Sequence, residues 1–453
     1  MDQHARRTRA LNSRSPRSDT KFILYWMQHS QRADGNPALE RAAYWANTCK
    51  LPLLVLFVVD PDYPDANLRH YTFMLQGLKE TMAAVERRGA AFSLRLGKPA
   101  EIAVQVSCEA AVVVTDRGYL RHLVAWRAQL ADEARCLVEM VEGDVIVPVE
   151  EASNRQETAA RTFRPRVHRA LPAFLDRPQA MALKCKAAGL GSKADQALDD
   201  PAAFAQALGC DASVAPVGDI EGGSKAARSR LASFLKDDLP NYDDGRADMV
   251  QRHVSVMSPY LHFGQISPLE IYHAVNDAEA KDDSRASYVE EMLVRRELAV
   301  NFVHHERNYD SFAAMPAWAR ETLEAHKGDP REHTYTRKDL EAGKTHDPYW
   351  NAAMREMRLT GYLHNHMRMY WGKRLIAMTN TPRTAYETAL ALNNKYFLDG
   401  RDANSYANIG WLFGLHDRGW PERDVFGKVR TMTASGLKRK FDIDAYVAWT
   451  ERL

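Results

Sequence analysis

Several features that would set a chain apart from ordinary globular proteins are scarce in this one. Its 453 residues include only five cysteines, and their wide spacing argues against a zinc site or a redox pair. The longest apolar stretch, Leu51 to Val59, is far shorter than the roughly 20 residues that a membrane-spanning helix needs. Residues 1–20 contain no apolar segment typical of a signal peptide. We therefore expect a reduced intracellular protein with no membrane or secretion signal.

The short motifs of common enzyme classes are also missing. The chain has no Walker loop, no G-x-G-x-x-G after an apolar run, no G-x-S-x-G and no H-E-x-x-H. Histidines do cluster, as His304–His305 and as His364–His366. Side chains at such spacings diverge on a helix, so one metal ion can rarely use both members of a pair. We predict no metal site.

Net charge is close to zero, with 61 Lys and Arg against 59 Asp and Glu. Residues 1–21 hold six basic and two acidic residues, which leaves the rest of the chain slightly acidic. Any nucleic-acid binding must therefore come from a local patch. Residues 418–440 form one, with seven Lys or Arg against two acidic residues, although a solvated surface would explain the same charges.

The length predicts two or three domains, because a domain has roughly 150 residues. Residues 1–20 indicate a disordered basic tail. Residues 21–175 alternate short apolar runs with amphipathic segments at Asn36–Thr48 and Arg69–Arg88, which predicts a Rossmann-like α/β domain with a parallel sheet. The expected strands are Phe22–Met27, Leu53–Val59, Ala91–Leu96, Ala111–Thr115 and Val145–Val149.

The second half of the chain has a different character. Residues 176–225 are rich in Ala, Gly, Asp and Ser and predict an interdomain linker. Residues 226–453 have almost no strand signals, so we expect an all-α domain. The expected helices are Lys225–Leu235, Pro268–Ala278, Ser287–His305, Trp350–Thr360, Tyr362–Ala377 and Ala385–Leu392.

Aromatic and basic residues are interleaved in this helical half. Such mixtures suit a pocket that stacks planar rings and contacts phosphates. A helical core with solvated rims is the alternative on composition alone. The aromatic members are Trp350, Tyr370, Trp371, Trp411 and Trp420, and the basic ones are Arg355, Arg358, Arg368, Lys373, Arg374 and Arg418.

Longer segments are far more specific than these patterns. In chain order they are Tyr71–Leu78 (YTFMLQGL), Thr162–Pro165 (TFRP), Ser258–Ser267 (SPYLHFGQIS), Gly343–Pro348 (GKTHDP), Met367–Trp371 (MRMYW) and Leu398–Asp402 (LDGRD). Through these segments, nearly the whole chain resembles the class II cyclobutane pyrimidine dimer (CPD) photolyases of the photolyase/cryptochrome flavoproteins.

This resemblance implies an FAD bound within the helical domain. Arg368 and Asp399 match an ion pair beside the flavin ring, and Asn393 matches an amide facing flavin N5. A fixed cation stabilises an anionic reduced flavin, and an amide can adjust its hydrogen bond to the redox state. A buried structural salt bridge and an ordinary helix cap at Ser258 are the alternatives. Further implied FAD contacts are Tyr242, Ser255, Met257, Ser258, Gln265, Asp402 and Asn404.

The resemblance also implies residues that contact damaged DNA. Glu291 matches a carboxyl that hydrogen-bonds the dimer, and Met369 and Trp411 match groups that pack on the flipped bases. Glu291 must be protonated to donate that bond, and burial beside Met369 and Trp411 would favour this form. Other implied DNA contacts are Arg246, Arg295, His366, Arg418 and Arg430, with isolated surface arginines as the alternative.

A few positions depart from the family pattern. Ala247 and Val256 stand where many relatives have Asn, and His366 stands where Tyr or Phe is usual. Arg295 occupies a position that is Trp in some relatives and Arg in others. These changes affect the expected details of lesion binding but not the expectation of a flavin.

Electron transfer to the flavin is expected through tryptophans. Trp371 matches the donor nearest the flavin and Trp350 matches the middle one. The distal tryptophan would fall two helical turns after Trp371, where this chain has Met378, and a thioether is much harder to oxidise. Tyr349 or Tyr370 could substitute for it.

Taken together, these features predict light-driven repair of CPDs by electron transfer from excited reduced FAD. The expected partner is UV-damaged double-stranded DNA, the expected state is a monomer, and the expected location is the cytoplasm with the nucleoid if the source is prokaryotic. A cryptochrome-like photoreceptor and a non-photochemical DNA-binding protein are the alternatives. A deazaflavin or folate antenna chromophore is possible, and no residue decides its identity.

Overall fold

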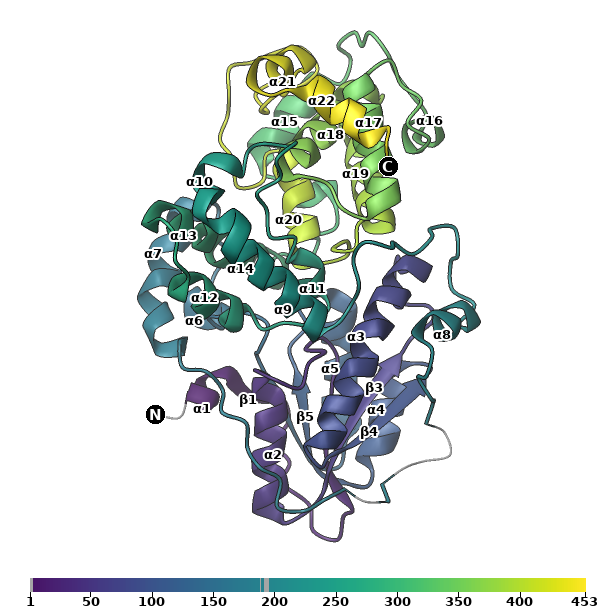
Figure 1. Cartoon of the computed structure of the whole chain (residues 1–453), viewed down its shortest axis with the longest axis vertical. Helices are drawn as coiled ribbons and strands as arrows, with labels where there is room; N and C mark the ends of the chain where they lie inside the picture. Colours follow the sequence, from purple (N-terminus) through teal and green to yellow (C-terminus); the bar gives the residue numbers. More distant parts are fainter. Residues whose placement is uncertain (1–2, 188, 191–194) are drawn as a thin grey trace.

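The computed structural model describes every residue except 1–2, 188 and 191–194. An α/β part built from the first half of the chain lies at the bottom of Figure 1, and a helical part lies above it. No described helix is both long and apolar enough to cross a membrane. The observed architecture therefore agrees with the expected α/β and all-α halves.

The sheet has six strands in the order β1-β6-β5-β2-β3-β4. All neighbours pair in parallel except β1 and β6. Every residue of β2, β3 and β5 is buried, because helices cover both faces of a parallel sheet. The parallel strands are β2 (Phe22–Trp26), β3 (Leu53–Val59), β4 (Ala91–Leu96), β5 (Ala110–Asp116) and β6 (Leu137–Val141).

Alternate strand residues contact different helices, as the period of two requires. Tyr25 and Val55 share a core with α2 and α3, whereas Leu24 and Leu56 share another with α4 and α5. The Asn36 side chain caps α2 by accepting hydrogen bonds from two backbone N–H groups of its first turn. These helices are α2 (Pro37–Cys49), α3 (Leu68–Arg87), α4 (Pro99–Ser107) and α5 (Arg121–Glu133).

The expected disordered tail is wrong for residues 3–10. They form α1 (Gln3–Arg7) and β1 (Thr8–Ala10), which pairs antiparallel with β6. The Arg7 guanidinium is buried and donates to the carbonyl oxygens of Val145 at 3.2 Å and Phe174 at 3.3 Å. A charge run that is bound to backbone carbonyls in this way is ordered despite its polar composition.

The expected strand at Val145–Val149 is also wrong. The last strand along the chain is β6, which ends at Val141. Residues 145–148 are buried but lie outside the sheet, and α6 (Val149–Ala152) follows them. Their N–H groups are satisfied by a side chain instead, because the Glu297 carboxylate accepts from Ile146 at 2.5 Å and from Val147 at 3.3 Å. Burial raises the pKa of Glu297 to about 7.

Two segments before the expected helical domain already pack with other parts of the chain. Phe163 and Val167 of α7 (Ala160–Ala170) share an apolar core with the helical part, although they precede residue 175. The linker region contains α8 (Pro201–Ala207), whose Ala205 joins the core beside α3.

The helical part surrounds a core formed by α14, α17, α18, α19 and α20. The expected helix Ser287–His305 is interrupted by a π-helical turn, η4 (Glu290–Arg295), a feature found frequently at functional sites. The α-helices of the helical part are α9 (Ser224–Ser233), α10 (Tyr242–Gly245), α11 (Ser258–His262), α12 (Pro268–Asp277), α13 (Asp282–Val289), α14 (Arg296–His305), α15 (Ala317–Ala325), α16 (Arg337–Glu341), α17 (Pro348–Thr360), α18 (Asn365–Met378), α19 (Pro382–Tyr396), α20 (Ala403–Leu412), α21 (Ala434–Lys440) and α22 (Ile443–Thr450).

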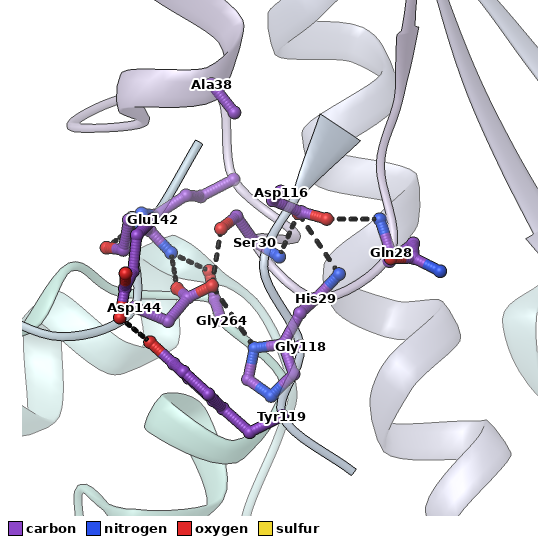
Figure 2. A network of polar contacts seen from close by, with 12 residues as sticks. Gln28, His29, Ser30, Ala38, Asp116, Gly118, Tyr119, Glu142, Asp144 and Gly264 are labelled. Atoms are coloured by element: carbon purple, nitrogen blue, oxygen red, sulfur yellow. Dashed lines mark hydrogen bonds and ion pairs between the residues drawn. The ribbon is translucent and has the colours of Figure 1, made fainter. Parts of the chain in front are cut away.

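Polar contacts at the carboxyl edge of the sheet join the two parts. Figure 2 shows Asp116 accepting hydrogen bonds from the backbone of Gln28 and Ser30 in the loop after β2. Arg32, buried in the same loop, donates to Asp144 at 2.6 Å and to the carbonyl oxygen of Gly264 at 2.9 Å. Gly264 has φ +63°, and a Cβ there would lie 2.1 Å from a backbone oxygen of this loop. The loop after β2 and the end of α11 therefore dock closely.

Candidate functional site

Helix α18 carries four of the predicted site residues. The His364 side chain caps its start by accepting from the backbone N–H of His366 at 3.3 Å. Arg368 and Met369 are partly exposed, whereas Trp371 is 1 % exposed. The residues around this one helix define the candidate site.

The structure brings Arg368 and Asp399 together as the sequence predicts. Nη2 of Arg368 lies 3.0 Å from each carboxylate oxygen of Asp399. The guanidinium also lies 4.0 Å from the Phe397 ring centroid, and its Nε donates to the Leu363 carbonyl. Asn393 is buried on α19 and donates to the Asn394 side chain at 3.1 Å. The cation is therefore fixed on several sides and still partly exposed.

The loop before α11 holds the predicted phosphate-binding residues. The Tyr288 hydroxyl donates to Ser255 Oγ at 2.9 Å, and the backbone of Met257 donates to the same oxygen at 3.4 Å. Ser258 is exposed at the first position of α11. Val256 has φ +52°, a left-handed conformation that is unfavourable for a β-branched side chain. Asparagine tolerates this conformation better.

Glu291 differs from its expected state. Its carboxylate accepts a hydrogen bond from Arg246 at 2.9 Å, and its side chain is 41 % exposed. The expectation that Glu291 is buried beside Met369 and Trp411 is therefore wrong. The Arg246 guanidinium lies 5.8 Å from the Tyr242 ring, so three predicted residues form one group.

A column of cations and aromatic rings forms a second group. Arg430 lies 5.4 Å from the Trp411 ring and 4.2 Å from the Trp420 ring, and Arg418 lies 5.2 Å from Trp420. Buried Lys373 approaches Trp411 to 5.0 Å and donates to the Leu412 carbonyl at 2.5 Å. Desolvation lowers the pKa of Lys373 to about 7. The sequence pattern pointed to Trp420 and Lys373 without giving them a role.

Arg295 and His366 lie at other edges of the site. Arg295 pairs with Glu290 at 3.2 Å, and Glu290 also pairs with Arg164. The His366 ring lies edge-on to Phe441 at 5.1 Å, and its buried Nδ1 has no hydrogen-bond partner. Burial lowers the pKa of His366 to about 4, so this imidazole is neutral at pH 7.

Trp350 and Trp371 are both buried and stack nearly parallel, with ring centroids 6.5 Å apart and an interplanar angle of 13°. Trp350 Nε1 donates to the Trp371 carbonyl at 2.9 Å, and Trp371 Nε1 donates to Met354 Sδ at 3.0 Å. Met378, at the expected third position, is 1 % exposed. Two indoles in such contact can exchange an electron readily.

Known proteins are similar to this chain over its full length. A family model described as DNA photolyase matches residues 23–184. A protein of Methanothermobacter thermautotrophicus named deoxyribodipyrimidine photo-lyase is 43 % identical over 446 residues, 98 % of each chain. The chain belongs to the DNA photolyase family. A second photo-lyase of that name, from Potorous tridactylus, is 37 % identical over 94 % of this chain and 80 % of its own.

Solved structures support the same fold for this photolyase. A class III photolyase from Agrobacterium tumefaciens gives a TM-score of 0.74 at 19 % identity, over 97 % of this chain and 88 % of that one. A Synechocystis cryptochrome gives 0.74 at 17 % identity, over 95 % and 88 %. At these identities the likeness concerns the fold alone.

Not every predicted cofactor contact lies in an open site of the photolyase. Gln265 is fully buried, donates to the Phe73 carbonyl and accepts from the backbone of Gly223. The structure therefore gives this amide a role at the interface between α3 and α9. Asp402 caps α20 and accepts from the Asn404 side chain at 3.1 Å. Asp402 also lines a cavity between the two parts of the chain.

That cavity was not foreseen from the sequence. It lies at the carboxyl edge of the sheet, where α/β folds commonly bind ligands. Rings from the α/β part line it, and His262 and Arg401 line it from the helical part. Arg401 is 4 % exposed, yet its Nε and Nη2 have no hydrogen-bond partner among the described residues, and neither does His262 Nδ1. Burial lowers the pKa of both side chains. These unpartnered groups indicate a polar ligand; the LDGRD run was the only sequence signal for it.

Proposed function

We propose that this photolyase repairs cyclobutane pyrimidine dimers as a class II enzyme, with light as the energy source. The observation that carries this proposal is that residues of both predicted sites, the one for FAD and the one for the dimer, lie around α18. In this proposal the Arg368–Asp399 pair contacts the flavin, and the Arg246–Glu291 pair and Trp411 contact the lesion.

The donor set around α18 suits an FAD. Arg368 supplies a fixed positive charge for an anionic flavin ring, and Asp399 holds that guanidinium in place. Ser255 and exposed Ser258 present hydroxyl groups for phosphate oxygens. FAD, when bound and reduced, supplies the electron that cleaves the dimer after excitation by light. The residues themselves position the ring and tune its charge.

The lesion side suits a dimer that has left the duplex. Trp411 and partly exposed Met369 offer flat and flexible apolar contacts for the joined pyrimidines. Arg418 and Arg430 present guanidinium groups to phosphates at the rim. A phosphate that takes Arg246 would release Glu291, which could then bind the dimer as a protonated acid. This exchange would reconcile the ion pair with hydrogen-bond donation to the lesion.

The interdomain cavity is a suitable site for an antenna chromophore. Its aromatic lining can stack a planar ring system, and Arg401 offers two free donors to an anionic or carbonyl group. A Sulfolobus tokodaii photolyase of similar fold is described with two FAD molecules, which its description connects with a novel light-harvesting cofactor. Deazaflavin, folate and flavin are therefore the candidates. An absorption spectrum of the purified protein after FAD extraction distinguishes them.

The decisive test is dimer loss from thymine-dimer duplex DNA under blue light, using enzyme whose FAD has been chemically reduced. We expect light-dependent repair by a monomer that retains FAD, and no repair in the dark. An enzyme that retains reduced FAD and binds the DNA but leaves dimers intact would support the cryptochrome-like alternative. Asp399→Asn, which removes the charge that holds Arg368, should weaken FAD retention and serves as the matched variant.

A further inference from the structure

The segment Gly343–Pro348 stood out in the sequence, and its Asp347 is the centre of a buried hydrogen-bond network. The Asp347 side chain is only 3 % exposed. One carboxylate oxygen accepts from the backbone N–H groups of Tyr349 and Trp350 at 3.1 Å each. The other accepts from the Tyr370 hydroxyl and from Arg374 Nε at 2.9 Å. One carboxylate therefore links the first turn of α17 to a tyrosine of α18.

Tyr370 is also close to the tryptophan pair along the backbone. The Trp350 indole donates its Nε1–H to the carbonyl of Trp371, the residue that follows Tyr370. All three side chains belong to the same apolar core, and Tyr370 is fully buried. One hydrogen bond and about seven covalent bonds along the backbone thus connect the Trp350 ring to the Tyr370 ring. This is a short path for an electron.

We propose that Tyr370 is the terminal electron donor of the shortened tryptophan chain and that Asp347 is the base that takes its proton. The inference rests on the proposed function, because the oxidant is the Trp350 radical cation that remains after oxidised flavin has drawn an electron through Trp371 under light. Trp350 regains one electron from the Tyr370 phenol, and the phenol proton passes to Asp347. The products are a neutral indole, a neutral tyrosyl radical and a protonated carboxyl group.

The charges around Tyr370 favour this coupled step. Burial and the negative charge of Asp347 raise the pKa of Tyr370 far above its ordinary value, so the phenol is protonated before the reaction. An oxidised phenol is a strong acid, and a carboxylate already hydrogen-bonded to it accepts the proton without any rearrangement. The neutral tyrosyl radical cannot easily return the electron until the proton comes back. The coupled proton transfer therefore replaces the missing indole at Met378.

Asp347 is connected to the surface through its other partners. Arg374 Nη2 lies 3.3 Å from His346 Nε2, and His346 Nδ1 lies 2.9 Å from the Tyr335 hydroxyl. His346 is exposed. Because a guanidinium only donates hydrogen bonds, this chain of groups holds the Asp347 carboxylate in place and does not relay its proton.

Tyr349 provides a matched comparison, since its hydroxyl also donates to a carboxylate, that of Asp444 at 3.0 Å. The Asp444 side chain is 70 % exposed and pairs with Lys438, whose ammonium lies 5.9 Å from the Tyr349 ring. Each carboxylate also pairs with a cation, Lys438 here and Arg374 at Asp347, but Asp347 is only 3 % exposed, so its contact with Tyr370 is shielded from solvent. The geometry therefore favours Tyr370 over Tyr349.

The test is electron paramagnetic resonance of the radical that light generates in the holoenzyme with oxidised FAD. Wild type labelled with ring-deuterated tyrosine should show a tyrosyl signal that narrows on labelling. Tyr370→Phe should lose this signal and show tryptophan radicals instead, whereas Tyr349→Phe should retain it. Asp347→Asn keeps a residue able to cap α17 but lacks the base, so it should lose the tyrosyl signal as well.

Only tryptophan radicals in wild type, or a tyrosyl signal that survives in Tyr370→Phe, would overturn the proposal. Loss of the signal in Tyr349→Phe would transfer the role to that residue and equally overturn it. Circular dichroism and FAD absorbance show that each variant is folded and loaded. Dimer repair by chemically reduced wild type tests the proposed function separately, because it requires no electron from Tyr370.

Discussion

Two pairs of tryptophans, Trp350 with Trp371 and Trp411 with Trp420, have opposite electrostatic surroundings. Trp371 and Trp350 stack on each other, and their N–H groups donate to a backbone oxygen and a thioether. In the described part of the chain no Lys or Arg lies over either ring. Trp411 instead has Lys373 and Arg430 within 5.5 Å of its ring, and Arg430 also faces Trp420. The same side-chain type therefore occupies two different environments.

The difference has a chemical consequence. A nearby positive charge raises the free energy of an indole radical cation, whereas an acceptor at the N–H group lowers it. Trp371 and Trp350 are thus easy to oxidise, and Trp411 is protected from oxidation. Trp371 and Lys373 are two residues apart, so they project from nearly opposite sides of α18. One helix therefore separates the proposed electron path from the proposed lesion-binding surface.

The largest expected effect comes from breaking the electron path. Trp371→Phe should abolish photoreduction of oxidised FAD, because phenylalanine cannot supply an electron to the flavin. The measurement is bleaching of the oxidised-flavin absorbance under blue light with an external reductant. Trp420→Phe is the control and should photoreduce like wild type. Equal bleaching in Trp371→Phe and wild type would show that the Trp350–Trp371 pair does not carry the electron to the flavin.

A change on the lesion side should have the reverse pattern. Glu291→Ala should lower the quantum yield of dimer repair while FAD retention and photoreduction stay near wild type, since Glu291 contacts Arg246 and not the tryptophan pair. The yield is measured on thymine-dimer DNA with chemically reduced enzyme at saturating DNA. Glu290→Ala, next to it in η4, is the comparison variant. Unchanged repair with intact lesion binding would remove Glu291 from the site.

Lengthening the electron path should increase its efficiency. Met378→Trp restores an indole at the third position and should speed photoreduction by separating the charges farther. Met378→Leu keeps an apolar side chain and should match wild type. The bleaching assay compares the three proteins. If Met378→Trp and wild type bleach at the same rate, Tyr370 already serves as well as a third tryptophan.

The buried cation next to Trp411 predicts a pH effect on stability. The pKa of Lys373 is about 7 in the folded chain and about 10.4 in an unfolded one. Between these values the unfolded chain binds more protons, so this lysine's contribution to the free energy of unfolding rises with pH, by at most about 1.4 kcal/mol per unit.

Lys373→Met removes this dependence. Its free energy of unfolding, relative to wild type, should therefore fall by about 1–2 kcal/mol between pH 7 and pH 9. Urea denaturation at the two pH values measures the change, and Lys428→Met, at the surface, is the control. A difference between variant and wild type that is independent of pH would contradict the lowered pKa.

The smallest effect concerns the loop that connects Arg246 to Ser255 and Ser258, the serines proposed to bind phosphate. Val256 adopts φ +52°, and Val256→Asn should stabilise the protein by about 1 kcal/mol because asparagine tolerates this conformation. Urea denaturation measures the gain. Val254→Asn, in the same loop, should not produce it. A loss of stability in Val256→Asn would mean that the valine side chain contributes packing that outweighs its strain.

Local patterns were sufficient for much of this molecule. Runs such as Leu53–Val59 became strands at the expected bounds, because seven consecutive apolar residues can be buried on both faces of a parallel sheet. Helix α17 ends at the expected Thr360 but begins two residues before the expected Trp350, because Asp347 caps it and Pro348 forms its first turn. The Arg368–Asp399 pair followed from the resemblance, and the structure joins the two residues.

Other features depend on contacts between distant segments. Val145–Val149 has a strand composition, but the N–H groups of Ile146 and Val147 bind Glu297, about 150 residues away, and not a neighbouring strand. The basic N-terminal residues are ordered because Arg7 meets carbonyl oxygens of residues 145 and 174. Neither partner can be recognised from the local pattern alone.

The sequence by itself thus determined the two-part architecture, the family and most residues around α18, because periodicity, caps and long motifs are local in the chain. Only the tertiary structure decided that Glu291 is paired and half-exposed, that Tyr370 shares a carboxylate with Trp350, and that Arg401 faces a cavity with free donors. Protonation, electron paths and ligand sites depend on which groups meet in space. The burial of these groups and the charges around them arise only when the chain is folded.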